Sequence, residues 1–144
     1  MTDKRCDMAV TPKSLRIPPR VLKKIKQIAE ETRKDFSRVT NELLEEAVKS
    51  RQCPGIVFTE GVRGEQRARI AGTGLEVWEI IESYLNSKKN FSHLSKEYHW
   101  LTEQQLKAAL GYYKAYPEEI DFLLRRNQSW TQEKIQKEYP FLSA

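Results

Sequence analysis

The chain has 144 residues, of which 39% are hydrophobic and 31% charged, and its formal net charge is +5. This length suits one ordinary domain or two small ones. No run approaches the ~18–20 apolar residues of a membrane helix, and the first residues lack the apolar segment of a secretory signal. Cys6 and Cys53 lie far apart without a second ligand nearby, which argues against a disulfide or a zinc site. We therefore expect a cytoplasmic protein.

Positive charge is concentrated at the N-terminal end. Residues 1–50 carry 12 Lys and Arg against 8 Asp and Glu, and no acidic residue occurs from Met8 to Ala29. Residues 118–144 carry 4 basic against 5 acidic side chains. This distribution predicts that an anionic partner, by default a nucleic acid, meets the N-terminal end.

The first ordered element after a disordered arm at 1–12 is predicted to be a short strand. Residues 14–17 alternate in polarity, so Ser14 and Arg16 would face outward and Leu15 and Ile17 would face inward. Two prolines end this strand, and the second of them, Pro19, is well suited to the first position of a helix.

Two amphipathic helices are predicted next, from Pro19 to a polar break at 32–36 and from an N-cap at Ser37 onward. One strand and two helices cannot cover their own apolar faces or pair their own backbone groups. Two copies could do both, by forming an antiparallel ribbon over interlocked helices. We therefore expect an obligate homodimer through residues 13–50.

The second half is predicted to follow a linker at 51–55. A domain at 56–117 would begin with two short strands, 56–58 and 67–70, around a turn at Gly61 to Gly64. A helix over 77–85, a short helix capped by Ser92, and a helix opened by a Thr102–Gln105 capping box would complete it. A helix beginning at Pro117 would lead into the tail, 118–144, which would also contain a last helical turn at 131–139.

The N-terminal pattern Ser14-Leu15-Arg16-Ile17-Pro18, followed by Val21-Leu22-x-x-Ile25, resembles the ribbon-helix-helix fold of the Arc, MetJ and CopG repressors. A two-stranded ribbon fits the DNA major groove, where Arg16 can bind a guanine bidentately and Ser14 can contact a base edge. Lys13 has the wrong parity for base reading and is assigned to phosphate. The resemblance also implies phosphate contacts by Ser37 and Arg38 at the start of the second helix.

A second resemblance involves three separated motifs. They read Arg69-Ile70-Ala71-Gly72-Thr73-Gly74, Leu101-Thr102-Glu103-Gln104-Gln105-Leu106, and Tyr116-Pro117-Glu118-Glu119-Ile120-Asp121. This region resembles the bacterial antitoxin-associated family called domain of unknown function 433, although Gly74 stands where that family commonly has arginine. The resemblance implies a three-helix homeodomain-like bundle and a VapB-type antitoxin paired with a PIN-like ribonuclease toxin. The predicted fold class is therefore mainly α, with a ribbon-helix-helix, a small β-hairpin, a three-helix bundle and a helical tail.

The tail is the candidate toxin-binding segment. PIN-type nucleases gather acidic side chains around a divalent metal, and arginine could neutralise such a site. The predicted contacts are Arg125 and Arg126, with Trp130, Tyr139 and Phe141 as apolar anchors. The alternative is that the two arginines only stabilise the C-terminal end of their helix.

No enzyme, cofactor or metal site is predicted. Gly72-x-Gly74 lacks a phosphate-loop pattern, His93 and His99 lack further ligands, and Ser92-His93 lacks a paired acid. The helix at 102–115 has a nearly neutral exposed set, which favours packing or partner binding over DNA contact.

These patterns together predict the antitoxin of a type II toxin–antitoxin system, a dimeric autorepressor of operator DNA that also inhibits a nuclease. One alternative is a ribbon-helix-helix transcriptional repressor without a toxin partner. Another is an inhibitor that binds only its enzyme, with the basic strand serving dimerisation. A neighbouring reading frame with spaced acidic residues would favour the antitoxin.

Overall fold

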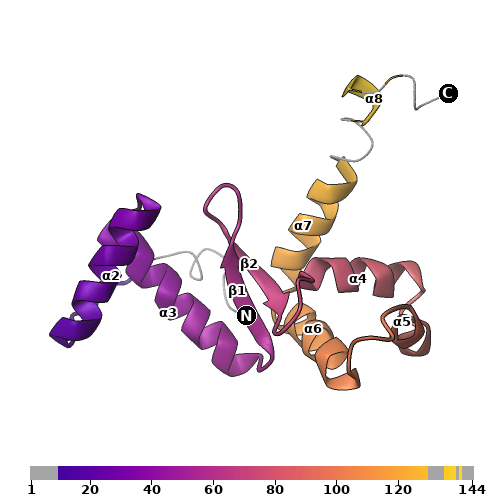
Figure 1. The fold of residues 1–144 in the computed structure, drawn as a ribbon, viewed down its shortest axis with the longest axis horizontal. Coiled ribbons are helices and arrows are strands. Elements are labelled where there is room, and N and C mark those ends of the chain that lie inside the picture. Colours follow the sequence, from indigo (N-terminus) through magenta and orange to yellow (C-terminus); the bar gives the residue numbers. More distant parts are fainter. Residues whose placement is uncertain (1–9, 130–134, 139, 141–144) are drawn as a thin grey trace. The chain divides into compact units, whose positions relative to one another are not determined.

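The computed structural model describes residues 10–129, 135–138 and 140, and these form a mainly helical protein with a small antiparallel sheet (Figure 1). The chain divides into two compact units, Met1–Asn41 and Glu42–Ala144. No helix in the described part of the chain is long and apolar enough to cross a membrane.

The first unit contains helix α2 (Pro19–Thr32) and the beginning of helix α3 (Phe36–Gln52). Pro19 occupies the first turn of α2, as predicted, where its missing N–H costs nothing. Arg33 ends α2 in the left-handed conformation, with φ of 56°, and its N–H bonds to the last-turn carbonyls. Ile25 and Val39 are the apolar side chains that are buried among the described residues of this unit.

The N-cap of α3 is Asp35, which corrects the prediction of Ser37. The Asp35 carboxylate accepts a hydrogen bond of 2.7 Å from the backbone N–H of Arg38. Asp and Ser are both good N-caps, so composition alone does not separate them, and the helix begins two residues earlier than expected.

Residues 13–17 are not in a strand in the described single chain. A strand is defined by pairing with a neighbour, and the partner expected here is the same segment of a second copy. Leu15 is 62% exposed, whereas Ile17 is half-buried. The ribbon therefore stays a prediction.

The second unit begins its sheet as predicted, with β1 (Ile56–Glu60) antiparallel to β2 (Gln66–Ile70). Ile56 pairs with Ile70 and Phe58 with Ala68, so this face of the hairpin carries the buried side chains. Arg67 and Arg69 alternate with them and belong to the opposite face.

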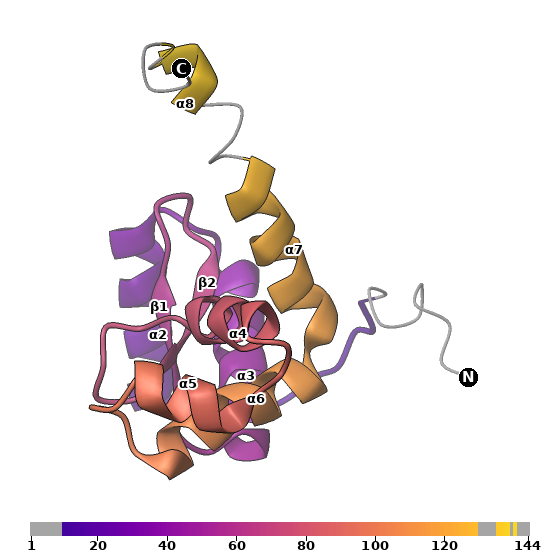
Figure 2. The same ribbon diagram turned by 90° about the vertical axis from the view of Figure 1, so that its right-hand side faces the viewer.

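Helices follow the hairpin: α4 (Val77–Asn86), α5 (Phe91–Glu97), α6 (Glu103–Ala115), α7 (Pro117–Ser129) and α8 (Ile135–Glu138). Helix α6 packs against both strands, α4 and α7, and α4 also contacts α5 and α7. In Figure 2, α4, α5 and α6 face the viewer. The core of this unit is continuous; its most buried large side chains are Ile70, Val77, Ile80, Ile81, Leu94, Leu106, Tyr112 and Ile120.

One of the two helix caps predicted for this unit is confirmed and the other is wrong. The Thr102–Gln105 capping box is confirmed, because each side chain accepts from the other's backbone N–H, at 3.1 and 2.8 Å. The cap of α5 is Asn90 rather than Ser92, with its side-chain oxygen 3.1 Å from the N–H of His93.

The segment 51–55, which we expected to be a linker, is largely built into the fold. Helix α3 continues through Gln52, and the Cys53 N–H bonds to the Lys49 carbonyl at 2.8 Å. The Cys53 side chain is buried in the core because a thiol behaves as a small apolar group there. Gly55, with φ of 93°, makes the turn into β1 in a conformation that side chains rarely adopt.

Candidate functional site

The residues predicted to contact DNA lie on the surface of the first unit. Lys13, Ser14 and Arg16 are exposed in the segment before α2, and Ser37 and Arg38 are exposed in the first turn of α3. Their exposure suits an interface with nucleic acid. However, the Asp35 carboxylate already occupies the Arg38 N–H, so this helix end is less suited to a phosphate than the sequence implied.

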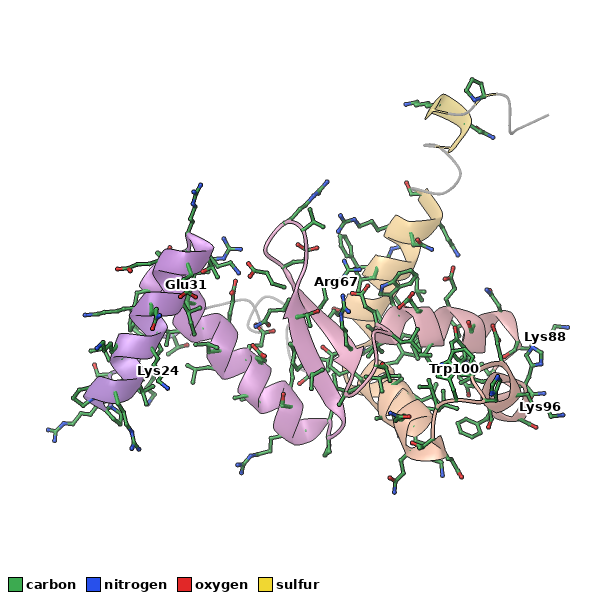
Figure 3. All side chains as sticks on the ribbon, viewed as in Figure 1. Lys24, Glu31, Arg67, Lys88, Lys96 and Trp100 are labelled. Atoms are coloured by element: carbon green, nitrogen blue, oxygen red, sulfur yellow. The ribbon has the colours of Figure 1, made fainter. Side chains whose placement is uncertain are left out.

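Helix α2 adds further positive charge near its beginning. Lys23, Lys24 and Lys26 are exposed, and Lys24 is labelled in Figure 3. Acidic residues appear only toward the end of the helix, where Glu31 accepts from Gln27 at 3.3 Å. The basic segment recognised in the sequence therefore continues through the first half of α2 as a solvent-facing surface.

A polar cluster around the buried Lys49, which the sequence did not reveal, lies in the second unit. The Lys49 ammonium is 3.2 Å from Glu45 and 3.3 Å from Glu119, and it sits 4.9 Å from the centre of the Tyr116 ring. Tyr112 donates to Glu119 at 2.6 Å. Burial raises the pKa of Tyr112, and its hydrogen bond to Glu119 raises it further. Tyr112 is therefore a fixed donor, and the buried Lys49 ammonium is paired with the exposed Glu45 and the half-buried Glu119.

A second charged cluster joins the hairpin to α4. Arg67 Nε is 2.6 Å and Nη2 3.3 Å from the two carboxylate oxygens of Glu76, and the Trp78 indole donates to the same carboxylate at 3.0 Å. Burial tends to raise the pKa of Glu76, but the hydrogen bonds from Arg67 and Trp78 outweigh it, and the pKa is lowered. The bidentate geometry holds Arg67 in one orientation; Arg67 is labelled in Figure 3.

A cavity of about 300 Å³ opens beside Arg67, between the hairpin and α7. A smaller hollow of about 160 Å³ adjoins it and shares Arg67, Leu123 and Arg126. We call the two together the α7 groove. The hairpin contributes Arg63, Glu65, Gln66 and Arg67, α4 contributes Trp78, and α7 contributes Glu119, Phe122, Leu123, Arg126 and Asn127.

The two arginines predicted to hold a toxin have different surroundings. Both are exposed on α7, but Arg126 lines the α7 groove and Arg125 is outside its lining. The predicted apolar anchors, Trp130, Tyr139 and Phe141, lie outside the described residues. The sequence therefore located one of the groove residues but did not indicate the cavity, since the lining residues of the hairpin and of α7 are more than 50 positions apart.

The histidines and the glycine turn are not grouped into a site. His93 is exposed in the first turn of α5, and the His99 ring lies edge-on to Trp100 at 5.2 Å. Gly72 has φ of 78° in the turn between β2 and α4, where Thr73 Oγ1 donates to the Ile70 carbonyl. Within the described residues, no three His, Cys, Asp or Glu side chains are placed to hold a metal ion.

Comparison with known proteins gives one match. The model of the family described as "Protein of unknown function (DUF433)" matches residues 56–113, which span β1 through most of α6. Neither a curated protein nor a solved structure matches the chain. The match agrees with the second resemblance drawn from the sequence, and the ribbon-helix-helix resemblance stays a prediction.

Proposed function

We propose that the chain is the antitoxin of a type II toxin–antitoxin system, a homodimer that represses its own promoter and inhibits a PIN-like ribonuclease. The observation that carries the proposal is the acid-free basic segment from Met8 to Ala29, which leads through an alternating strand pattern into two helices. In the paired form, Ser14 and Arg16 face base edges, and Lys13, Ser37 and Arg38 contact phosphates.

Exposed apolar side chains support the dimer. Leu15 is 62% exposed, Val21 41%, Leu44 52% and Val48 54%. Val21 lies one helical turn from the buried Ile25 on α2, and Leu44 and Val48 lie one turn apart on α3. Large apolar residues at core spacing, left exposed in the single chain, are what a second copy would cover.

The toxin-binding half of the proposal has separate support. The family match covers the segment whose motifs resemble antitoxin-associated proteins, and exposed arginines follow it on α7. Guanidinium groups suit the acidic metal site of a nuclease. Binding of two dimers by one toxin assembly would raise operator affinity, because the second contact becomes intramolecular.

The test is a titration of purified protein onto fluorescent DNA from its own promoter, at two salt concentrations. Arg16→Ala should weaken binding to the promoter by roughly 5- to 150-fold, as expected for a lost bidentate base contact of ~1–3 kcal/mol, and should weaken binding to random DNA much less. The matched control is Lys24→Ala, which removes the same charge from the exposed side of α2. Its loss should be small and equal on both DNAs.

Either of two results contradicts the repressor half. One is no binding of the wild-type chain at low salt, and the other is an equal loss for Arg16→Ala and Lys24→Ala on the promoter. If DNA is bound but the protein encoded by the adjacent reading frame is not, the repressor without a toxin partner replaces the antitoxin. That alternative is favoured by the same basic segment.

A further inference from the structure

The α7 groove combines an apolar interior with arginines at its rim. Phe122 is 57% exposed in it, and Leu123 and Trp78 are half-buried beside it. Its larger part, about 300 Å³, is at the lower end of the ~300–1,000 Å³ range of ligand pockets. This size suits one or two side chains of a partner better than a cofactor.

The carboxylates of the groove are already engaged by this chain. Glu119 bonds to Lys49 and Tyr112. Glu65 accepts from the Arg63 N–H at 2.9 Å and lies 3.6 Å from the Arg67 guanidinium. A ligand therefore meets these acids as compensated groups.

The three arginines of the groove differ in how far carboxylates of this chain already hold them. Arg67 is held by Glu76 in a bidentate pair. Arg63 and Arg126 are exposed at opposite walls, on the hairpin turn and on α7, and the charge of Arg126 helps to lower the pKa of Glu65. These two exposed guanidinium groups can each form bidentate bonds with an incoming carboxylate.

We propose that the α7 groove binds an acidic segment of a partner protein, with carboxylates on Arg63 and Arg126 and one apolar side chain against Phe122 and Leu123. Arginine and aromatic residues around a desolvated pocket are the usual composition of an interface hot spot. A nucleic-acid backbone fits less well, because the space between the arginines is apolar and is lined by Phe122 and Leu123. The inference rests on the proposed function, which identifies the partner as the nuclease.

The experiment measures the affinity of the full-length chain for the protein encoded by the adjacent reading frame, by calorimetry with purified components. The groove variants are Arg126→Ala and Phe122→Ala. Arg125→Ala is the matched control for charge, since it is the neighbouring exposed arginine on α7 outside the groove. Trp100→Ala is the control for loss of an exposed aromatic side chain, at 60% exposure away from the groove. Circular dichroism at increasing temperature checks that all four variants fold.

Each groove variant should weaken the complex by ~10-fold or more, and each control by less than ~3-fold. Unchanged affinity in both groove variants would overturn the groove while leaving the proposed function intact. Equal losses for Arg125→Ala and Arg126→Ala, with Phe122→Ala unaffected, would also overturn it, since this indicates diffuse charge attraction.

Two further outcomes are informative. If the wild-type chain does not bind the neighbouring protein at all, the toxin half of the proposed function fails and the groove proposal falls with it. If Arg126→Ala, but not Arg125→Ala, lowers the affinity for a random-sequence 20-nucleotide duplex or single strand, the groove is a nucleic-acid surface and the proposal is wrong.

Discussion

Glu76 links β2 to α4 in the second unit through its carboxylate. It accepts from Arg67 on β2 and from Trp78 on α4, and its own N–H donates to Glu79 at 2.8 Å. The Glu76 and Arg67 side chains are only 16% and 17% exposed. Solvent therefore screens this pair less than a surface ion pair, and the arginine bordering the α7 groove depends on it for its orientation.

We expect Glu76→Gln to destabilise the protein at pH 7 by about 1–3 kcal/mol, because a neutral acceptor replaces a charge-assisted one in a partly buried site. The folded-state pKa of Glu76 is lowered from its ordinary value of 4.5. Its contribution is thus fully present above about pH 4.5 and is lost as pH falls through the folded pKa. The difference between wild type and variant, measured by urea unfolding, should shrink as the pH falls below 4.5.

The control for this prediction is Glu97→Gln, which changes an exposed carboxylate at the end of α5. It should change the free energy of unfolding little at any of these pH values. A difference between wild type and Glu76→Gln that stays constant from pH 7 to pH 3.5 would contradict the role assigned to the Glu76 charge.

At the level of single residues, the sequence predicted exposed positions better than buried partners. Arg16 and Arg126 are exposed as their polarity suggests. Lys49 is 9% exposed, and its partner Glu119 is 70 positions away, so no local pattern indicates the pair. Long-range ion pairs depend on how helices pack, which periodicity does not specify.

Helix ends show the same limit at the scale of elements. The break after α2 is visible in the sequence, but Asp35 and Ser37 lie only two positions apart and both suit an N-cap, and the structure selects Asp35 over Ser37. A negative side chain at this end also interacts favourably with the helix dipole. The hairpin was easier to predict, because alternation and the Gly61–Gly64 turn both indicate it.

We expect Asp35→Ala to destabilise α3 by about 1 kcal/mol, since it leaves the N–H of Arg38 without its cap. Ser37→Ala, two residues into the helix, is the matched control and should cost no more than a few tenths of a kcal/mol. Urea unfolding monitored by circular dichroism would measure both. A larger loss for Ser37→Ala than for Asp35→Ala would restore the cap predicted from the sequence.

At the scale of the whole molecule, the two units differ in how completely they cover their own apolar residues. The second unit buries a continuous core from Ile56 to Ile120. The first unit buries Ile25 and Val39 among its described residues, while Leu15 and Val21 remain exposed. The sequence predicted such a deficit, because one strand and two helices cannot cover their own apolar faces, and the second copy expected to cover them stays a prediction.

We expect Leu44→Glu to convert the dimer into a monomer, because a carboxylate on the apolar side of α3 would be buried without a partner at the interface. Light scattering after size-exclusion chromatography measures the mass, which is 16.9 kDa for one chain. Val62→Glu is the control, since Val62 lies fully exposed at the hairpin turn, outside α2 and α3. A monomeric wild type, or a Leu44→Glu variant that stays dimeric, would contradict the predicted interface.

The fold of the second half was thus largely predictable, because hairpin, capping and proline signals are local. The α7 groove was not, because it forms only where the hairpin turn and α7 meet. The ribbon lies between these cases, since its pattern is local but its pairing requires another chain.

The sparse core of the first unit has a consequence for the order in which proteases would cleave the chain. If the proposed dimer completes this region, the fraction of it that is folded rises with protein concentration, by mass action. As the chain becomes scarce, its N-terminal end should open first to proteases, while the hairpin and the helices after it persist. When synthesis of the chain stops, proteolysis would then remove the basic N-terminal segment before the rest of the chain. The proposed DNA binding would in this way depend on the concentration of the protein.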